Sequence, residues 1–175
     1  YYTNLRIQLK FSVYLCKKSE SMLTYLELSE LIHKTVHRLP LPQEPKLLFD
    51  PIRYTLDAGG KRVRPLLALG SCSLFTDDME PALPAAMGIE VFHTFTLLHD
   101  DIMDRSVMRR GRDTVHVRWN ENVASLSGDA MLIFASNLLS QSDPSKMPPL
   151  FPLFNRMVLA VREGQMYEMA FESRA

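Results

Sequence analysis

The segment His99–Gly111, with the sequence HDDIMDRSVMRRG, gathers acidic and basic side chains at a spacing suited to metal and phosphate chemistry. Asp100, Asp101 and Asp104 have a D-D-x-x-D spacing. On an α-helix they occupy an arc of about 100°, with Asp104 about 40° from Asp100. Three carboxylates on one side of a helix repel one another unless cations share the site, and Mg²⁺ commonly combines carboxylates with substrate phosphates. The spacing therefore predicts a metal-bridged phosphate site.

Basic residues accompany the aspartates in two places. Arg109 and Arg110 follow them directly, and their planar guanidinium groups suit phosphate. The earlier segment Gly59–Pro65, GGKRVRP, has two glycines that let backbone amides approach an anion, and Pro65 suits the start of a helix whose N-terminus favours anions. Such a loop is most often solvated surface when it stands alone. Together with the acidic cluster, it favours a phosphate site.

The histidines near the aspartates leave two assignments open. His93 precedes Asp100 by about two helical turns, roughly 10 Å, within about 20° of the same face. It could contact a second anionic group or be a hydrogen-bonded core histidine. His99 and His116 are predicted to be structural. A non-haem iron or zinc site from His93, His99 and Asp100 is possible by ligand type, but the adjacent aspartates and arginines suit Mg²⁺ and phosphate better.

These motifs together resemble the isoprenyl (polyprenyl) diphosphate synthase family, which includes farnesyl and geranylgeranyl diphosphate synthases. The matching pieces, in the family's order, are GGKRVRP at 59–65, His93, DDIMD at 100–104, RRG at 109–111, Gly128-Asp129 and Gly164-Gln165. The resemblance covers residues 44–172. It implies an all-α helical bundle around a central cavity, assembled as a homodimer when complete.

The resemblance also implies a division of the site between two substrates, isopentenyl diphosphate and an allylic diphosphate. The diphosphate of isopentenyl diphosphate would be held by Lys61, Arg64, His93 and Arg110. Asp100 and Asp104 would bind Mg²⁺ that bridges to the allylic diphosphate, with Asp101 supporting the cluster and Arg109 contacting the same diphosphate. Metal and arginine would neutralise the charge that develops on the leaving diphosphate. Such a prenyl transfer needs no protein nucleophile.

Product length in the family depends on residues four or five positions before the first aspartate, here Thr96 and Phe95. Thr96 lies one helical turn below Asp100, where a growing chain would pass. The Phe95 ring could form the floor of the pocket or simply pack in the core. As a floor it would limit products to farnesyl or geranylgeranyl length.

Two departures from the family pattern bear on the metal site. The family's Gly-Gln-x-x-Asp motif ends here in Glu168, to which the sequence alone assigns no metal role. The family also has a second aspartate-rich motif across the cavity, and residues 105–175 contain none. We therefore expect the chain to be an N-terminal portion of such an enzyme, inactive by itself.

The elements that position these residues are predicted to be helices. Apolar periodicity, proline and glycine place helices at about 21–39, 51–56, 65–75, 84–104 and 123–140, and from about 153 onward. Thr24 and Glu27 fit a capping box. The stretches 114–119 and 142–152 are expected to be connections. Residues 1–20 are left unassigned, and 21–175 are expected to form the N-terminal part of a single domain.

Composition excludes several other classes. Lys+Arg and Asp+Glu number 20 each, which argues against a nucleic-acid surface. No apolar run reaches the length of a membrane span, and Cys16 and Cys72 are expected to be unpaired thiols, so we expect a cytoplasmic protein. The alternatives are a class I terpene cyclase, a non-catalytic subunit of a prenyl synthase and a purely structural helical module. A cyclase has no need for a second basic diphosphate site, and a non-catalytic subunit does not need intact DDIMD and RRG motifs.

Overall fold

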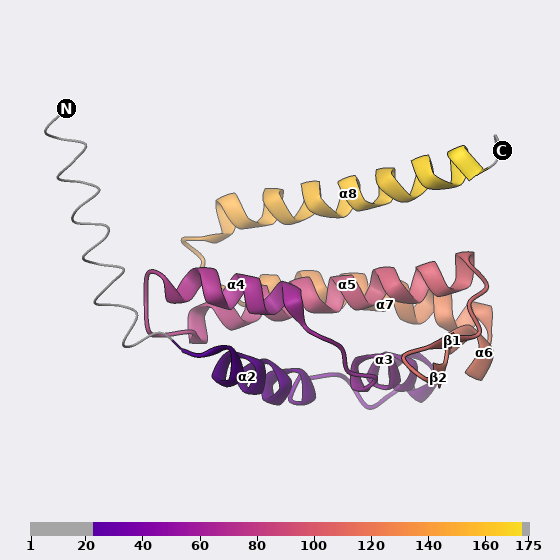
Figure 1. Cartoon of the computed structure of the whole chain (residues 1–175), viewed down its shortest axis with the longest axis horizontal. Coiled ribbons are helices and arrows are strands. Elements are labelled where there is room, and N and C mark those ends of the chain that lie inside the picture. Colours follow the sequence, from indigo (N-terminus) through magenta and orange to yellow (C-terminus); the bar gives the residue numbers. More distant parts are fainter. Residues whose placement is uncertain (1–22, 173–175) are drawn as a thin grey trace, which may run out of the picture.

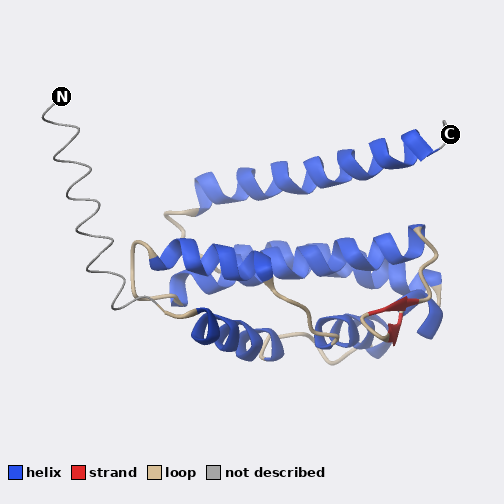
Figure 2. Cartoon of the chain, viewed as in Figure 1, coloured by secondary structure: helices blue, strands red, loops and turns tan. Residues whose placement is uncertain are grey.

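The computed structural model describes residues 23–172, and the unassigned segment 1–20 lies outside them. The described part is built of helices with one small hairpin, which Figure 2 shows as the only strands among them. The helices are α2 (Tyr25–His37), α3 (Lys46–Asp57), α4 (Val63–Ser73), the short 3₁₀ helix η1 (Glu80–Ala82), α5 (Leu83–Met103), α6 (Val115–Arg118), α7 (Glu121–Leu139) and α8 (Met147–Glu172). The hairpin strands are β1 (Met108–Arg109) and β2 (Arg112–Asp113). The prediction of an all-α fold is confirmed.

The bundle is centred on α5, which packs along α7 more extensively than any other pair of elements. In Figure 1, α2 and α3 lie on one side of this pair and α8 runs along the other. Helix α5 is apolar over most of its circumference, as expected for a helix enclosed by its neighbours. Its Met87, Val91, Phe95 and Leu98 are almost completely buried. The site residues of α5 therefore stand on a helix held from several sides.

Local signals explain how several helices begin and end. At the start of α2 the Glu27 amide donates to Thr24 Oγ1 at 3.3 Å and the Thr24 amide donates to Glu27 Oε2 at 2.7 Å, so the predicted capping box is confirmed. Helix α3 ends before Gly59, which has φ of 75° and terminates it as predicted. No helix among residues 23–172 combines the length and apolarity needed to cross a membrane.

Three predicted boundaries were wrong, and proline position explains the one at the start of α8. Helix α3 begins at Lys46 and continues through Pro51, and α8 begins at Met147 rather than near 153. Prolines 148 and 149 lie in the first turn of α8, where a missing N–H removes no helical hydrogen bond. The stretch 114–119, expected to be a loop, contains the single helical turn α6, which is too short to leave a periodic signal.

Candidate active site

The aspartates lie where α5 ends. Asp100 and Asp101 are in its last turn, and Asp104 caps it, donating its amide to the Asp100 carbonyl at 2.8 Å. The structure divides the three carboxylates between two sides of the helix. Asp100 and Asp104 line one cavity of about 240 Å³, facing α8, whereas Asp101 is buried beside the hairpin. Of the three aspartates expected to share one site, only Asp100 and Asp104 therefore line the same cavity.

Helix α8 completes the acidic cavity. The Gln165 side-chain amide donates to the Asp100 carboxylate, and Glu168 lines the same space. Burial, and then the charge of Asp104, raises the pKa of Asp100, while Arg109 and the Gln165 hydrogen bond act in the opposite direction. Because the neighbouring Asp104 carboxylate adds to the cost of ionising Asp100, a cation bound between them would be favourable.

The donor atoms of this cavity fit Mg²⁺. Asp100, Asp104, Glu168 and Gln165 all offer oxygen, the ligand that hard divalent ions prefer. Within residues 23–172, no three His, Cys, Asp or Glu side chains converge closely enough to hold one ion by themselves. A magnesium ion here would therefore keep positions for water or phosphate oxygens, as Mg²⁺ usually does.

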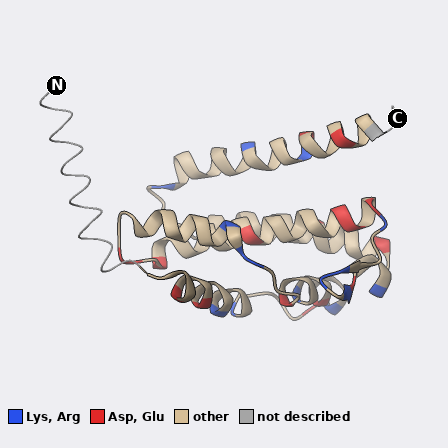
Figure 3. Ribbon diagram, in the orientation of Figure 1, with Lys and Arg blue, Asp and Glu red and all other residues tan. Residues whose placement is uncertain are grey.

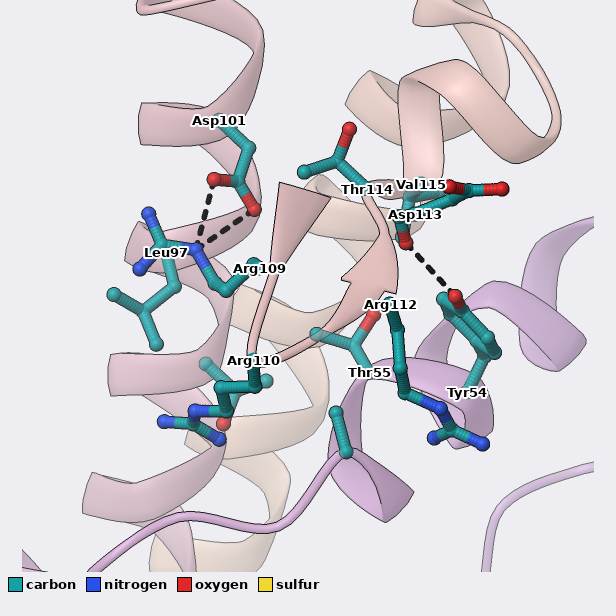
Figure 4. A pocket seen from close by; sticks show the side chains of 12 residues that line it. Tyr54, Thr55, Leu97, Asp101, Arg109, Arg110, Arg112, Asp113, Thr114 and Val115 are labelled. Atoms are coloured by element: carbon teal, nitrogen blue, oxygen red, sulfur yellow. Dashed lines mark hydrogen bonds and ion pairs between the residues drawn. The ribbon is translucent and has the colours of Figure 1, made fainter. Parts of the chain in front are cut away.

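Asp101 holds Arg109 instead of facing the acidic cavity. Arg109 Nε donates to Asp101 Oδ1 at 2.8 Å and to Oδ2 at 2.9 Å, as Figure 4 shows. Burial raises the pKa of Asp101, and the Arg109 hydrogen bond and charge oppose that rise. Because the pair uses Nε, the terminal amino groups of Arg109 remain as donors for an anion near the aspartates.

The hairpin that carries the arginines is a tight two-residue turn. Met108 pairs with Asp113 and Arg109 with Arg112, leaving Arg110 and Gly111 as the turn. Both have positive φ, 54° and 75°, the conformation of a type I′ turn. The Tyr54 hydroxyl of α3 donates to the Asp113 carbonyl at 2.8 Å, which fixes the hairpin to the bundle (Figure 4). Sequence inspection missed this hairpin because two-residue strands leave no alternating pattern.

The basic segment forms a second cavity, of about 460 Å³, on another side of α5. Figure 3 shows the loop between α3 and α4 as a run of basic residues. The lining residues are Ala58, Gly60, Lys61, Arg62, Val63, Arg64, Glu90, His93 and Arg110. The structure thus brings together the four residues predicted to hold the diphosphate of isopentenyl diphosphate: Lys61, Arg64, His93 and Arg110. Their ligand stays a prediction.

Arg110 reaches this cavity by crossing the glycine pair. Its guanidinium donates to the Gly59 carbonyl, and a Cβ at Gly60 would lie 2.7 Å from the guanidinium carbon. Gly60 also has φ of 134°, a backbone conformation that other residues rarely adopt, so glycine suits this position. Burial, and then the neighbouring Arg62 charge, lowers the pKa of Arg110. Cations crowded in this way are stabilised by a bound anion.

His93 is half-buried in the basic cavity and is neutral at neutral pH. Burial first, then the charges of Arg64 and Arg110, lowers its pKa to about 4. A neutral imidazole can still donate one hydrogen bond to phosphate.

This depressed pKa predicts a pH effect on stability. Between about pH 6.5 and 4 the unfolded chain binds a proton at His93 that the folded chain does not, so unfolding becomes easier as the pH falls through this range. We expect His93→Gln to flatten the fall in urea midpoint between pH 7 and 5. His33→Gln, an exposed change on α2, should keep the wild-type slope. An equal slope in the His93 variant would contradict the assignment.

The comparison with known proteins agrees with this geometry. The sequence model of the Polyprenyl synthetase family matches residues 45–175. The chain belongs to this family. Its match includes both cavities, the hairpin and all of α8.

The curated proteins that the chain resembles include geranylgeranyl diphosphate synthases. The chain is 43% identical over 123 residues to the enzyme of Cyanophora paradoxa, covering 69% of this chain and 41% of that protein. It is 39% identical over 148 residues to the geranylgeranyl pyrophosphate synthase of Geoglobus acetivorans, covering 83% and 46%. The chain thus spans less than half the length of these two relatives.

Solved structures show the same fold. A geranylgeranyl pyrophosphate synthase crystal structure matches with a TM-score of 0.83 at 44% identity, covering 86% of this chain and 46% of that one. The geranylgeranyl pyrophosphate synthetase of Pyrococcus horikoshii matches with a TM-score of 0.78 at 31% identity, covering 94% and 49%. Both matches place the described helices in an isoprenoid synthase fold.

The two residues predicted to set product length, Phe95 and Thr96, are buried in the core. Phe95 is fully buried against His99, with ring centroids 4.7 Å apart, and the Arg162 guanidinium lies 4.5 Å above its ring. The Thr96 hydroxyl donates to the His93 carbonyl of its own helix at 2.8 Å. Neither lines the Asp100 cavity, so the packing alternative describes Phe95 in this structure. A role in product length stays a prediction.

His99 has the structural position expected of it in this family member. Its ring lies against Gly128 of α7, where a Cβ would be 2.3 Å from Nε2, so this part of the GD motif has a packing reason. Burial lowers the pKa of His99. Sequence reasoning gave no role to two other residues, Glu168 and Arg162, because only the fold brings α8 opposite the end of α5.

Proposed function

We propose that this chain is part of a prenyl diphosphate synthase of isoprenoid biosynthesis, which joins an allylic diphosphate to isopentenyl diphosphate. The observation that carries the proposal is a pair of cavities of opposite charge on one helix. Asp100 and Asp104 line the acidic one, and the GGKRVR loop with His93 lines the basic one. A reaction between two diphosphates, one bound through metal and one through cations, requires this pairing.

The residues have distinct tasks in the proposed reaction. Lys61, Arg64 and Arg110 neutralise the diphosphate of isopentenyl diphosphate, and neutral His93 donates a hydrogen bond to it. Arg109, oriented by Asp101, stabilises charge on the allylic diphosphate as it leaves. Asp100 and Asp104 would hold Mg²⁺, which supplies further neutralisation of that leaving group when bound.

The bonds balance without a protein nucleophile. The allylic carbon–oxygen bond breaks and its electron pair leaves with the diphosphate. The double bond of isopentenyl diphosphate supplies the electrons of the new carbon–carbon bond, which leaves a carbocation on the former double bond. The adjacent carbon then loses a proton to the released diphosphate, and the electrons of that carbon–hydrogen bond form the new double bond. The names of the relatives support geranylgeranyl as the product within the farnesyl-to-geranylgeranyl range.

We further propose that the complete protein is a cytoplasmic homodimer. Apolar side chains on the outer surfaces of α7 and α8 support association, because Ile133 and Leu159 are 62% and 61% exposed. The family resemblance implies the same state.

The binding of each substrate separately tests the proposed function. We expect isopentenyl diphosphate to bind this chain without Mg²⁺ and to lose binding in Arg64→Met, whereas geranyl diphosphate should bind only with Mg²⁺. Titration calorimetry with and without EDTA measures both. A terpene cyclase would bind geranyl diphosphate but not isopentenyl diphosphate, so that result would contradict the proposal.

Turnover by the 175-residue chain is expected to be negligible. Residues 105–175 lack the second aspartate-rich motif that the family resemblance places across the cavity, so this chain supplies one metal-binding face. Mass spectrometry of a reaction containing isopentenyl diphosphate, geranyl diphosphate and Mg²⁺ measures it. Detection of a longer prenyl diphosphate would contradict this expectation, because it would show that one metal-binding face is sufficient for prenyl transfer.

A further inference from the structure

Arg62 differs from the other two cations of the GGKRVR loop because its side chain points into the protein. Lys61 and Arg64 are exposed, whereas the side chain of Arg62 is only 4% exposed. Its Nη1 lies 2.6 Å from Oε1 of Glu90, a carboxylate on α5 that is 3% exposed. Its Nη2 donates to the carbonyl of Leu56 near the end of α3. One side chain thus joins the loop to two helices.

The contacts of the Arg62 side chain also hold an unusual backbone conformation at this residue. Arg62 has φ of 46° and ψ of 38°, a left-handed conformation, at the position that caps α4. A side chain other than glycine adopts this conformation at a cost in free energy, so surrounding contacts must hold it. The turn at Arg62 leads from the glycine pair into α4 and leaves Lys61 and Arg64 on the outer side.

Glu90 places a carboxylate in the wall of the basic cavity, and Arg62 is its ion-pair partner. Glu90 lines the basic cavity one helical turn before His93, where an unpaired carboxylate would repel phosphate and attract Lys61 and Arg64. Pairing with Arg62 cancels that charge and keeps the exposed cations free for an anion. Arg62 Nε and Glu90 Oε2 are nevertheless buried without hydrogen-bond partners among the described residues. A buried pair with unmet donors and acceptors is a weak source of stability, which points to a geometric task.

We propose that Arg62 and Glu90 are positioning residues that fix the GGKRVR loop so that Lys61 and Arg64 face an incoming diphosphate. This inference rests on the proposed function of the basic cavity. It divides the three cations of the motif into two that contact the anion and one that orders the loop.

The test separates positioning from stability with four variants: Arg62→Met, Arg62→Met/Glu90→Met, Arg62→Lys and Arg64→Met. Inorganic pyrophosphate in EDTA is the probe, measured by calorimetry, because without Mg²⁺ only the basic cavity should bind it. Arg62→Met leaves Glu90 buried and unpaired, so its thermal midpoint should fall. The double variant removes both charges and should recover the midpoint, since apolar pairs replace buried ion pairs well. Its pyrophosphate affinity should remain at least about tenfold weaker, because the loop is no longer attached.

A second readout does not depend on anion binding. Trypsin cleavage after Lys61 reports loop order, and the double variant should be cut faster than wild type at equal thermal midpoint. Arg64→Met should lose pyrophosphate binding with unchanged cleavage and midpoint, because Arg64 contacts only the anion in this scheme. Arg62→Lys keeps the charge opposite Glu90 but not the fork that reaches Leu56, so it should retain stability and lose affinity several-fold.

The possible failures are distinguishable. If the double variant recovers both affinity and cleavage resistance, or Arg62→Lys binds as wild type, Arg62 is not a positioning residue. If wild type itself does not bind pyrophosphate, the proposed function of the cavity fails. In that case trypsin cleavage still tests whether Arg62 and Glu90 order the loop. Faster cleavage of the double variant would support this role, and unchanged cleavage would overturn it.

Discussion

Asp100→Ala should remove the Mg²⁺-dependent binding of geranyl diphosphate to this chain. Asp100 lines the acidic cavity with Asp104 and accepts a hydrogen bond from Gln165, so we propose its carboxylate as the principal ligand of a bound Mg²⁺. Loss of an outer partner costs metal sites about 10–100-fold in affinity, and loss of a ligand should cost at least as much. Titration calorimetry at fixed Mg²⁺, repeated in EDTA, isolates the metal-dependent part.

A matched control lies on α8, the helix that faces the aspartates. Glu163 is exposed on α8 beside Gly164 and does not line the cavity, so Glu163→Gln should bind as wild type. Glu168→Gln should weaken binding by less than Asp100→Ala does, because Glu168 faces the cavity from the opposite helix. Equal Mg²⁺-dependent binding by wild type and Asp100→Ala would refute the metal site.

The acidic site illustrates what sequence can and cannot predict. The DDIMD spacing and the apolar pattern located both the helix and its carboxylates, because these are local properties of one element. The angle of about 100° between Asp100 and Asp101 follows from helical geometry alone. Whether Asp101 faces the hairpin, however, depends on the position of β1. A tight turn and a contact with α3 fix the position of β1. Long-range packing of this kind leaves no local signal.

The basic site shows the same limit within one motif. GGKRVR predicted an anion loop, and the structure gathers its residues around one cavity with His93. Nothing in the motif indicates which cation turns inward. That choice follows from a left-handed residue and a glutamate 28 positions later. The role of Arg62, left open by the sequence, could be argued only once α5 was placed against the loop.

Phe95→Ala should strongly destabilise the chain. The Phe95 ring is completely buried among Phe92, His99 and Arg162, which come from α5 and α8. Truncating a buried phenylalanine costs about 3–5 kcal/mol through lost apolar burial and the cavity left behind. Urea unfolding followed by circular dichroism measures the change, and Phe171→Ala, at an exposed position on α8, should shift the free energy of unfolding by less than about 0.5 kcal/mol. A loss in Phe95→Ala below about 1 kcal/mol would contradict the burial of this ring in the core.

The same substitution tests the predicted role in product length. Removing the ring opens space beneath the Arg162 guanidinium, which now covers it, on the α5 face that turns toward α8. If the growing prenyl chain meets this floor, Phe95→Ala in a complete enzyme that contains this segment should shift products beyond geranylgeranyl length, measured by mass spectrometry. An unchanged product profile together with the expected loss of stability would make Phe95 a core residue alone. The free energy of unfolding and the product length are independent measurements, so a loss of stability alone does not establish a role in product length.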